Sequence, residues 1–195
     1  MTPWLVVGLG NPGERYAQTR HNIGARVAER LAERLGARLR KVRFIPIEVA
    51  EATLGGERVY VARPQTFMNV SGPPVASFAK RRKVDVEHVI VCHDEIDLAF
   101  GALKVKRGGS TAGHNGLKSL QQAFRSPDFY RVRLGVGRPP GRKDAADHVL
   151  DRFTKAEREE VELLIEAGAD AVETLIREGL TAAQGRHNRS GPMGA

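Results

Sequence analysis

The stretch HVIVCHDEID at residues 88–97 is a short apolar run that ends in polar residues. An uninterrupted run of this kind is typical of a strand buried on both faces, at the centre of a sheet that helices cover. Leu5 to Val7 predict another such strand, and the helical spacing of apolar residues from Ile23 to Leu35 predicts a helix behind it, with Asn22 as N-cap. We therefore expect an α/β fold.

The rest of the chain supplies further elements of the same kind. We expect a hairpin of residues 44–53 and 58–63 around Gly55 and Gly56, an edge strand over 103–107, a helix over 116–124, a strand over 130–137, and a long amphipathic helix that a Thr154/Glu157 capping box introduces. No repeat or linker divides the 195 residues. Residues 1–184 are expected to form one domain with a mixed central β-sheet flanked by helices, and residues 185–195 a disordered tail.

The composition indicates in which part of the cell the protein is located. No apolar run is long enough to cross a bilayer, and the first residues lack the pattern of a secretory signal. The single cysteine, Cys92, excludes an internal disulfide and a cysteine-cluster metal site. A cytoplasmic protein without membrane contact is expected.

The balance of charge points to a polyanionic partner. The formal net charge is +8 at pH 7, and such a surface attracts nucleic acid and releases its counterions. Basic residues gather in four clusters: Arg38 to Arg43, Lys80 to Lys83, Lys104 to Arg107, and Gly137 to Lys143. One cluster alone is often only a solvated face, but four together favour RNA or DNA.

Gly8, Gly10 and Gly13 match the G-x-G-x-x-G pattern of dinucleotide-binding loops. In that motif the helix begins within the glycines, and an acid about 20 residues on meets the ribose at a strand end. Here helical periodicity begins only after ERYAQTRH, and Glu29 and Glu33 fall within the helix. We therefore expect this loop to serve another purpose.

Unusual polar residues follow several predicted strands, where sites form in open α/β sheets. Each has an ordinary structural explanation as a turn, cap or core residue. However, only five asparagines occur in the chain, and three of them fall in these loops. The candidate site residues are Asn11, Asn69, Asp94, His114 and Asn115, together with His21 at the start of the first helix.

These residue types suit hydrolysis of an ester or a similar acyl bond. A histidine beside a carboxylate can act as a general base, and amides can donate to a developing oxyanion. At a helix N-terminus, His21 would be kept neutral by the helix dipole, and Asp94 would stabilise its cation as it forms. No G-x-S-x-G elbow occurs and Cys92 lies in a strand, so direct attack by water is favoured. A metal is not expected, because His93, Asp94 and Glu95 alternate between the faces of a strand.

Over nearly its whole length the sequence closely resembles the bacterial peptidyl-tRNA hydrolases. The matching stretches are GLGNPGERYAQTRHNIGARVAE, RPQTFMNVSG, HDEIDLAFG, GGSTAGHNGLKS and YRVRLGVGRP, in the family's order and spacing. The resemblance implies the peptidyl-tRNA hydrolase fold, which is phosphorylase/hydrolase-like, and a monomeric esterase without cofactor. It would free tRNA by hydrolysing the ester between a peptide and the 3′-terminal ribose.

By position, the resemblance makes His21 the catalytic base and Asp94 its partner. Asn11, Asn69 and Asn115 would bind the substrate, and Tyr16, Met68 and His114 would shape the groove. Lys106 and Arg133 match the family's pair for the tRNA 5′-phosphate, a contact that positions RNA without reading its sequence. The chain departs from the family pattern at Ala112, where many relatives carry glycine and a positive φ would be strained, and in DLAFG, which lacks the usual proline and would loosen the loop after Asp94.

Other functions remain open from the sequence. The same scaffold could bind RNA without catalysis, although such a protein would not need His21, Asp94 and three pocket asparagines. A metal-free nuclease could use His21 and His114 as an acid/base pair. A nicotinamide enzyme would use the opening glycines.

Overall fold

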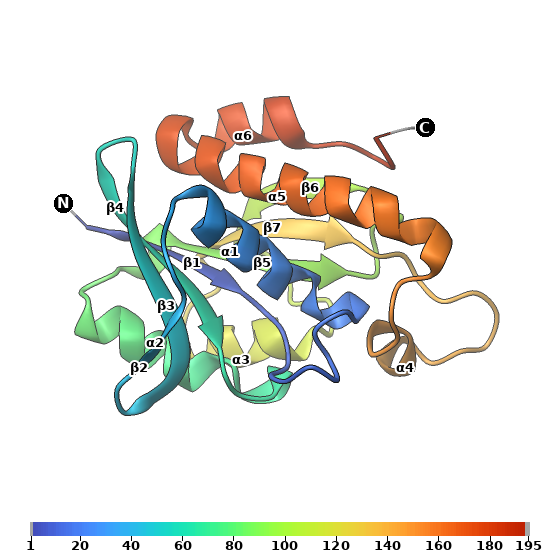
Figure 1. Ribbon diagram of the computed structural model, residues 1–195, viewed down its shortest axis with the longest axis horizontal. Coiled ribbons are helices and arrows are strands. Elements are labelled where there is room, and N and C mark those ends of the chain that lie inside the picture. Colours follow the sequence, from blue (N-terminus) through green and yellow to red (C-terminus); the bar gives the residue numbers. More distant parts are fainter. Residues whose placement is uncertain (1, 194–195) are drawn as a thin grey trace.

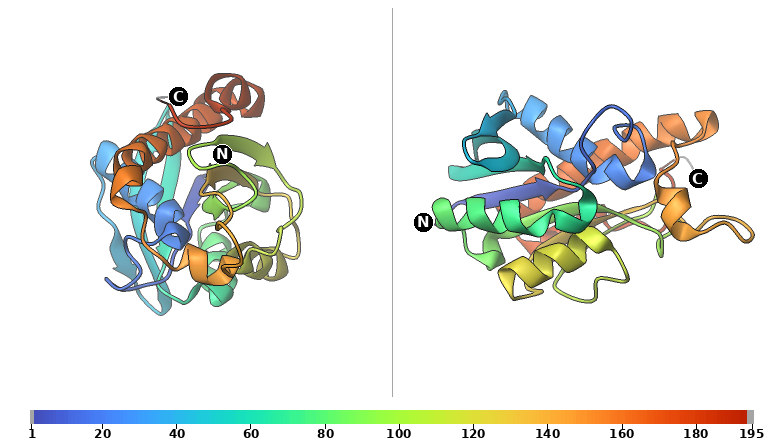
Figure 2. Two further views of the ribbon diagram at one scale, coloured as in Figure 1. Left: turned by 90° about the vertical axis from the view of Figure 1, so that its right-hand side faces the viewer. Right: turned by 90° about the horizontal axis from the view of Figure 1, so that it is seen from below.

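The computed structural model describes residues 2–193 and contains one seven-stranded sheet between two layers of helices (Figures 1 and 2). The strands lie in the order β2-β3-β4-β1-β5-β7-β6. Neighbours among β4, β1, β5 and β7 are parallel, and β2, β3 and β6 are added antiparallel at the edges. The predicted mixed sheet in a single α/β domain is confirmed.

The strands and helices have the following bounds. The strands are β1 (Trp4–Gly8), β2 (Arg40–Val42), β3 (Ile45–Leu54), β4 (Glu57–Pro64), β5 (Val89–Glu95), β6 (Leu103–Arg107) and β7 (Tyr130–Gly135). The α-helices are α1 (Ile23–Arg34), α2 (Gly72–Arg81), α3 (Asn115–Phe124), α4 (Ala145–Val149), α5 (Arg158–Glu178) and α6 (Leu180–His187). Short 3-10 turns precede three of these helices: η1 (Arg20–Asn22) before α1, η2 (Met68–Val70) before α2 and η4 (Lys155–Glu157) before α5.

Alternate residues of the central strands feed two separate cores. Val6 of β1 and Ile90 of β5 pack on the side of α1 and α5, whereas Leu5 and Val91 pack on the side of α2 and α3. Burial on both faces explains why β1 and β5 are uninterrupted apolar runs. The left view of Figure 2 shows the resulting helix–sheet–helix layers.

Close backbone contacts explain the first glycines. A Cβ atom added at Gly8 would lie 2.4 Å from the carbonyl oxygen of Gly24 in α1, and one added at Gly24 would lie 2.1 Å from that of Cys92 in β5. Only glycine permits helix and strands to approach so closely. Helix α1 begins at Ile23, well after Gly13, so the expectation that these glycines are not a dinucleotide loop agrees with the fold.

Helix α1 is also joined to α5 by charge. Arg26, Arg30 and Arg34 form ion pairs with acids of α5, namely Glu162, Glu166, Asp170 and Glu173. Exposed pairs contribute about 0–1 kcal/mol each, so this network supports a contact that the apolar core establishes. The capping box of Thr154 and Glu157 is confirmed at η4, which leads directly into α5.

Two sequence predictions differ from the structure. Asn22 occupies the N-cap position of α1, but its side chain makes no capping bond because it holds the backbone of Asn11 instead. The segment predicted as a disordered tail continues α6 to His187 and then pairs Arg189 with Leu103 through two backbone hydrogen bonds. Edge strand β6 offers unpaired backbone groups that make this contact possible. Residues 194–195 of that segment lie outside the described residues.

The loop after Asp94, which the sequence suggests is loosened, is tied to the end of β7. Gly101 N–H donates to the carbonyl of Gly135, and Gly137 N–H donates to that of Leu98.

None of the helices within residues 2–193 combines the length and apolar character needed to cross a bilayer.

Candidate active site

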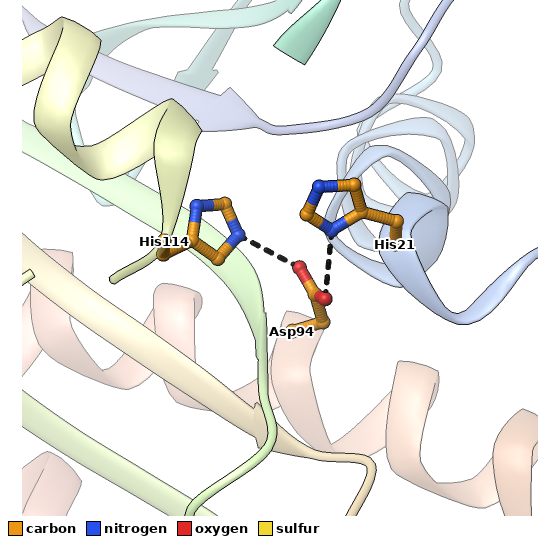
Figure 3. A group of neighbouring side chains, drawn as sticks. All are labelled: His21, Asp94 and His114. Carbon is orange, nitrogen blue, oxygen red and sulfur yellow. Dashed lines mark hydrogen bonds and ion pairs between the residues drawn. The ribbon is translucent and has the colours of Figure 1, made fainter. Parts of the chain in front are cut away.

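Two histidines share one buried carboxylate at the carboxyl edge of the sheet. Nδ1 of His21 lies 2.8 Å from Oδ2 of Asp94, and Nε2 of His114 lies 2.8 Å from Oδ1 of the same residue (Figure 3). Asp94 is the penultimate residue of β5, His21 lies in η1 before α1, and His114 precedes α3. The structure thus unites three elements of the predicted site around Asp94.

Hydrogen bonds fix the tautomer of each ring. Nδ1 of His114 accepts from the backbone N–H groups of Gly116 and Leu117, so its hydrogen is on Nε2, which donates to Asp94. Both nitrogens of His114 are therefore occupied. His21 donates from Nδ1 to Asp94, and its Nε2 has no partner within residues 2–193. In this neutral form, Nε2 of His21 carries the lone pair that can accept a proton.

The pKa values follow from this arrangement. Burial alone would raise the pKa of Asp94, but His21 and His114 together hold it well below its usual range, so Asp94 is ionised. Burial alone would lower the pKa of His21, but the charge of Asp94 and the hydrogen bond to it outweigh burial and raise that pKa. The expected lowering by the helix dipole is therefore not the net result, because Asp94 is in direct contact.

His93 and Cys92, the two residues before Asp94 in β5, are fully buried. Burial, with a smaller effect of His114, lowers the pKa of His93 to about 3, so the ring stays neutral, with Nδ1 at 2.8 Å from the backbone oxygen of Asp94. Burial raises the pKa of the Cys92 thiol to about 12, which leaves it without nucleophilic thiolate at neutral pH.

The side chain of Asn11 is held in one orientation. Its Oδ1 accepts from the backbone N–H of Met68 at 2.7 Å, while Asn22 bonds both its backbone N–H and its carbonyl. This leaves Nδ2 of Asn11 without a partner among the described residues, as a donor at the wall of the site. The role of Asn22 as a clamp was missed in the sequence, where its position before a helix indicates a cap.

A cavity of about 470 Å³ contains the predicted site. Its lining includes Asn11, His21, Met68, Asn69, Asp94, His114 and Asn115. The side chains of Asn69 and Asn115 are exposed and make no hydrogen bond within residues 2–193. The cavity therefore offers amide donors from three loops beside the histidine.

The apolar wall of this cavity was not predicted. Phe67 and Ile96 form part of it, and Val149 and Leu150 contribute from the end of α4. Tyr16 does not line the cavity, but its ring lies edge-on to Phe67 with centroids 6.4 Å apart. A wall of this kind suits apolar side chains of a ligand, and no motif in the sequence indicates it because α4 is short and its partners are remote.

Lys106 and Arg133 lie outside the cavity, on one face of β6 and β7. Lys106 is paired in register with Arg131, and Arg133 with Lys104, so four cations share that face. Burial and the neighbouring Arg133 and Arg131 lower the pKa of Lys106. Arg133 donates from Nε and Nη2 to Oε1 of Glu95, which lines the cavity. The cationic face and the cavity thus meet at Glu95.

The Ala112 backbone has the expected unfavourable conformation, with φ of +48°. Replacing Ala112 with Gly should raise the free energy of unfolding by about 0.5–1 kcal/mol, because glycine adopts positive φ without a Cβ clash. Urea denaturation would measure this. Ala146→Gly, within α4, should lower stability instead, and equal effects of the two substitutions would contradict the strain at Ala112.

The side chains of His21, Asp94 and His114 could also be considered as ligands of a metal ion. Ligand atoms of His21, Asp94 and His114 lie within 4.8 Å of one another. However, the two facing nitrogens carry the hydrogens that bond to the ionised Asp94, and coordination would require their lone pairs. Binding a metal would break both hydrogen bonds, so this donor set fits proton transfer better.

Comparison with known proteins gives one consistent result. The family model described as peptidyl-tRNA hydrolase matches residues 5–193. The chain is 54% identical over 186 residues to the peptidyl-tRNA hydrolase of Frankia casuarinae, covering 95% of this chain and 94% of the relative. It is 56% identical over 180 residues to that of Mycobacteroides abscessus, covering 92% of each.

Solved structures agree. A crystal structure of peptidyl-tRNA hydrolase from Acinetobacter baumannii superposes with a TM-score of 0.90 at 33% identity, covering 96% of this chain and 95% of that one. A 5′-methylthioadenosine nucleosidase of Arabidopsis thaliana has a TM-score of 0.54 at 11% identity over 91% of this chain and 98% of that one, a likeness of fold alone.

Proposed function

The chain belongs to the peptidyl-tRNA hydrolase family, and on that premise we propose that His21 is the general base which activates water against the ester of peptidyl-tRNA. The reaction of this hydrolase separates the peptide from the 3′-terminal ribose of tRNA. The observation that carries the proposal is the orientation of His21, whose Nδ1 donates to Asp94 while Nε2 remains free at the cavity.

Each step has a group to perform it. Nε2 of His21 accepts a proton as the water oxygen attacks the ester carbon, and Asp94 stabilises the imidazolium that forms. Amide donors of Asn11, Asn69 and Asn115 can bind the peptide backbone and the developing oxyanion. Collapse of the tetrahedral intermediate breaks the bond from the acyl carbon to the ribose oxygen, which takes up the proton from His21.

The alternatives suggested by the sequence fit the site less well. A nuclease with His21 and His114 as acid and base would need a free nitrogen on His114, and both are occupied. An RNA-binding protein without catalysis would have no use for a buried, ionised carboxylate that raises the pKa of a neighbouring histidine.

Wild-type protein should release free tRNA from N-acetyl-aminoacyl-tRNA. Excess EDTA should not reduce the rate, because no step of the proposed mechanism uses a metal ion. Acid-soluble nucleotides should not appear. Loss of activity in EDTA that zinc or magnesium restores would contradict the water mechanism, and failure to hydrolyse by folded protein that still binds tRNA would favour the binding function.

Lys106 and Arg133 are proposed to hold the 5′-phosphate at the acceptor stem, beside the cavity that takes the 3′ end. Lys106→Gln should raise KM by about 10- to 100-fold, since a charge-assisted contact is worth about 1.5–3 kcal/mol. The control Lys155→Gln removes the same charge from η4 and should have little effect. A substrate without 5′-phosphate should be insensitive to Lys106→Gln, and equal sensitivity of both substrates would contradict this role.

A cytoplasmic location and a monomeric state remain predictions.

A further inference from the structure

The turn between β2 and β3 presents an aromatic ring to solvent. Arg43 and Phe44 form this two-residue turn, and Phe44 is 86% exposed. In Figure 1 the turn lies at the lower left, beside α2. Its ring packs into neither core, so the fold does not require an aromatic residue at this position.

The backbone conformation at this position is unfavourable for phenylalanine. Phe44 has φ of +68°, the left-handed region in which a bulky side chain is strained. The second position of such a turn is usually glycine or asparagine, because they reach this conformation more readily. An exposed ring kept in a strained conformation indicates a use other than folding.

Two of the basic clusters meet at this turn. The Arg43 guanidinium lies 4.8 Å from the centroid of the Phe44 ring, and Arg81 Nη1 at the end of α2 donates to the Arg43 carbonyl at 3.3 Å. We give the name hairpin patch to Phe44 and the exposed cations of the two clusters that this contact joins, namely Lys41, Arg43, Lys80, Arg81, Arg82 and Lys83.

The charges of the hairpin patch are not neutralised by the protein. All six cations are exposed, and none forms an ion pair within residues 2–193. The arginines of α1 differ, because each is matched to acids of α5. The nearby Glu48 is paired with Arg63. An uncompensated cluster of this density repels itself and is stabilised by a polyanion.

The turn of the hairpin patch lies beyond the carboxyl end of β4, because Ile47 near the start of β3 pairs with Pro64 at the end of β4. The carbonyl of Pro46, two residues after Phe44, accepts from the backbone N–H of Gln65 at 2.8 Å. Two residues further on, Phe67 lines the cavity. A polymer with its end in the cavity can therefore extend toward the turn.

We propose that the hairpin patch is a second RNA-binding surface, which contacts the tRNA away from its 3′ end. Its cations neutralise backbone phosphates, and Phe44 stacks against a base or a ribose. A peptide is the weaker candidate, because the peptides carried by tRNA have no common charge that would select six cations. The proposal assumes a tRNA substrate but not the roles assigned to His21 and Asp94.

The substitution Phe44→Gly tests the role of the ring in binding tRNA without weakening the fold. Removing the strained side chain should leave the thermal midpoint unchanged or raise it, whereas loss of stacking should weaken binding of deacylated tRNA roughly fivefold or more. Leu163→Ala, an exposed apolar residue of α5, is the control and should not alter affinity. If Phe44→Gly binds tRNA like wild type, the stacking role is wrong.

The cations are tested by the salt dependence of binding. Arg43→Gln with Arg81→Gln should lower the slope of log affinity against log salt by about two, one for each phosphate contact. Arg58→Gln with Arg186→Gln removes the same charge from residues paired to Glu51 and Glu178, and should lower the slope less. Equal slopes for the two double variants would overturn the proposal.

Turnover measurements distinguish a role of the hairpin patch in binding tRNA from a role in hydrolysis. The patch variants should raise KM for full-length N-acetyl-aminoacyl-tRNA but not for the same ester on a short 3′-terminal oligonucleotide, with kcat unchanged for both. Equal losses on both substrates, or a defect that appears only with longer peptides, would overturn the RNA assignment. If the wild type fails to hydrolyse either substrate, the proposed function fails, yet the binding experiments still test the patch.

Discussion

His21→Ala should reduce turnover of N-acetyl-aminoacyl-tRNA by about 10²- to 10⁴-fold, the contribution typical of a general base. Of the two histidines that bond to the Asp94 carboxylate, His21 alone keeps a nitrogen, Nε2, with neither a hydrogen nor a partner among the described residues. Release of free tRNA under single-turnover conditions would measure the loss. The fold and tRNA affinity should be retained, because His21 is at the cavity surface and Asp94 keeps its bond to His114.

His21→Asn is the sharper comparison. An asparagine can still donate to Asp94 from its amide, but it cannot accept a proton at neutral pH. It should therefore be as inactive as His21→Ala while preserving the local hydrogen bond. If His21→Asn retained more than a tenth of wild-type activity, another group would have to be the base.

Asp94→Asn should reduce turnover by about 10³- to 10⁴-fold, the order of effect seen when the carboxylate partner of a catalytic histidine is neutralised. A carboxylate accepts from both His21 and His114, whereas an amide offers one acceptor and one donor group. One histidine must then turn or lose its partner. Asp97→Asn in the following loop, where the side chain pairs with Arg138, should leave turnover near wild type.

The pH dependence gives Asp94→Asn a second readout. Because the base must be neutral, wild-type turnover should rise with pH through the pKa of His21, which Asp94 raises above 6.5. Removing the charge should lower that pKa and move the rise to lower pH, with a reduced plateau. An unshifted profile would show that Asp94 does not set the protonation of His21.

The same pKa shift links activity to stability with opposite sign. A histidine whose folded-state pKa is raised stabilises the fold most fully below its unfolded pKa, and this contribution disappears as pH rises through the folded value. The pair of His21 and Asp94 is thus most stabilising in the protonated form, which cannot act as the base. Gain of activity with pH is accompanied by loss of this part of the stability.

The site could be predicted in outline because its residues follow parallel strands. Asn11 comes after β1, and Asp94 lies near the end of the adjacent strand β5, so both are at the edge where the carboxyl ends of these strands meet; His21 and His114 contact Asp94 there. Periodicity and turn chemistry suffice for this much. They locate the loops without specifying the side-chain contacts inside them.

The contacts that the sequence did not reveal depend on competition between partners. Asn22 could cap α1 or clamp Asn11, and only the packed fold shows that it does the second. His114 shapes the cavity as expected, but its bond to Asp94 depends on α3, whose backbone N–H groups occupy Nδ1. The wall from α4 and the pairing of Arg189 with β6 likewise join segments far apart in the chain.

The contact of Gly24 with the backbone of Cys92 has a consequence for ligands of the cavity. Main-chain atoms in direct contact cannot yield as side chains do, so the floor that carries His21 and Asp94 presents one fixed shape. The side chains of Phe67 and α4, which form the apolar wall, are then the parts of the cavity that can adjust to different peptides. An inhibitor would therefore meet a rigid surface at the floor and an adaptable one at the wall.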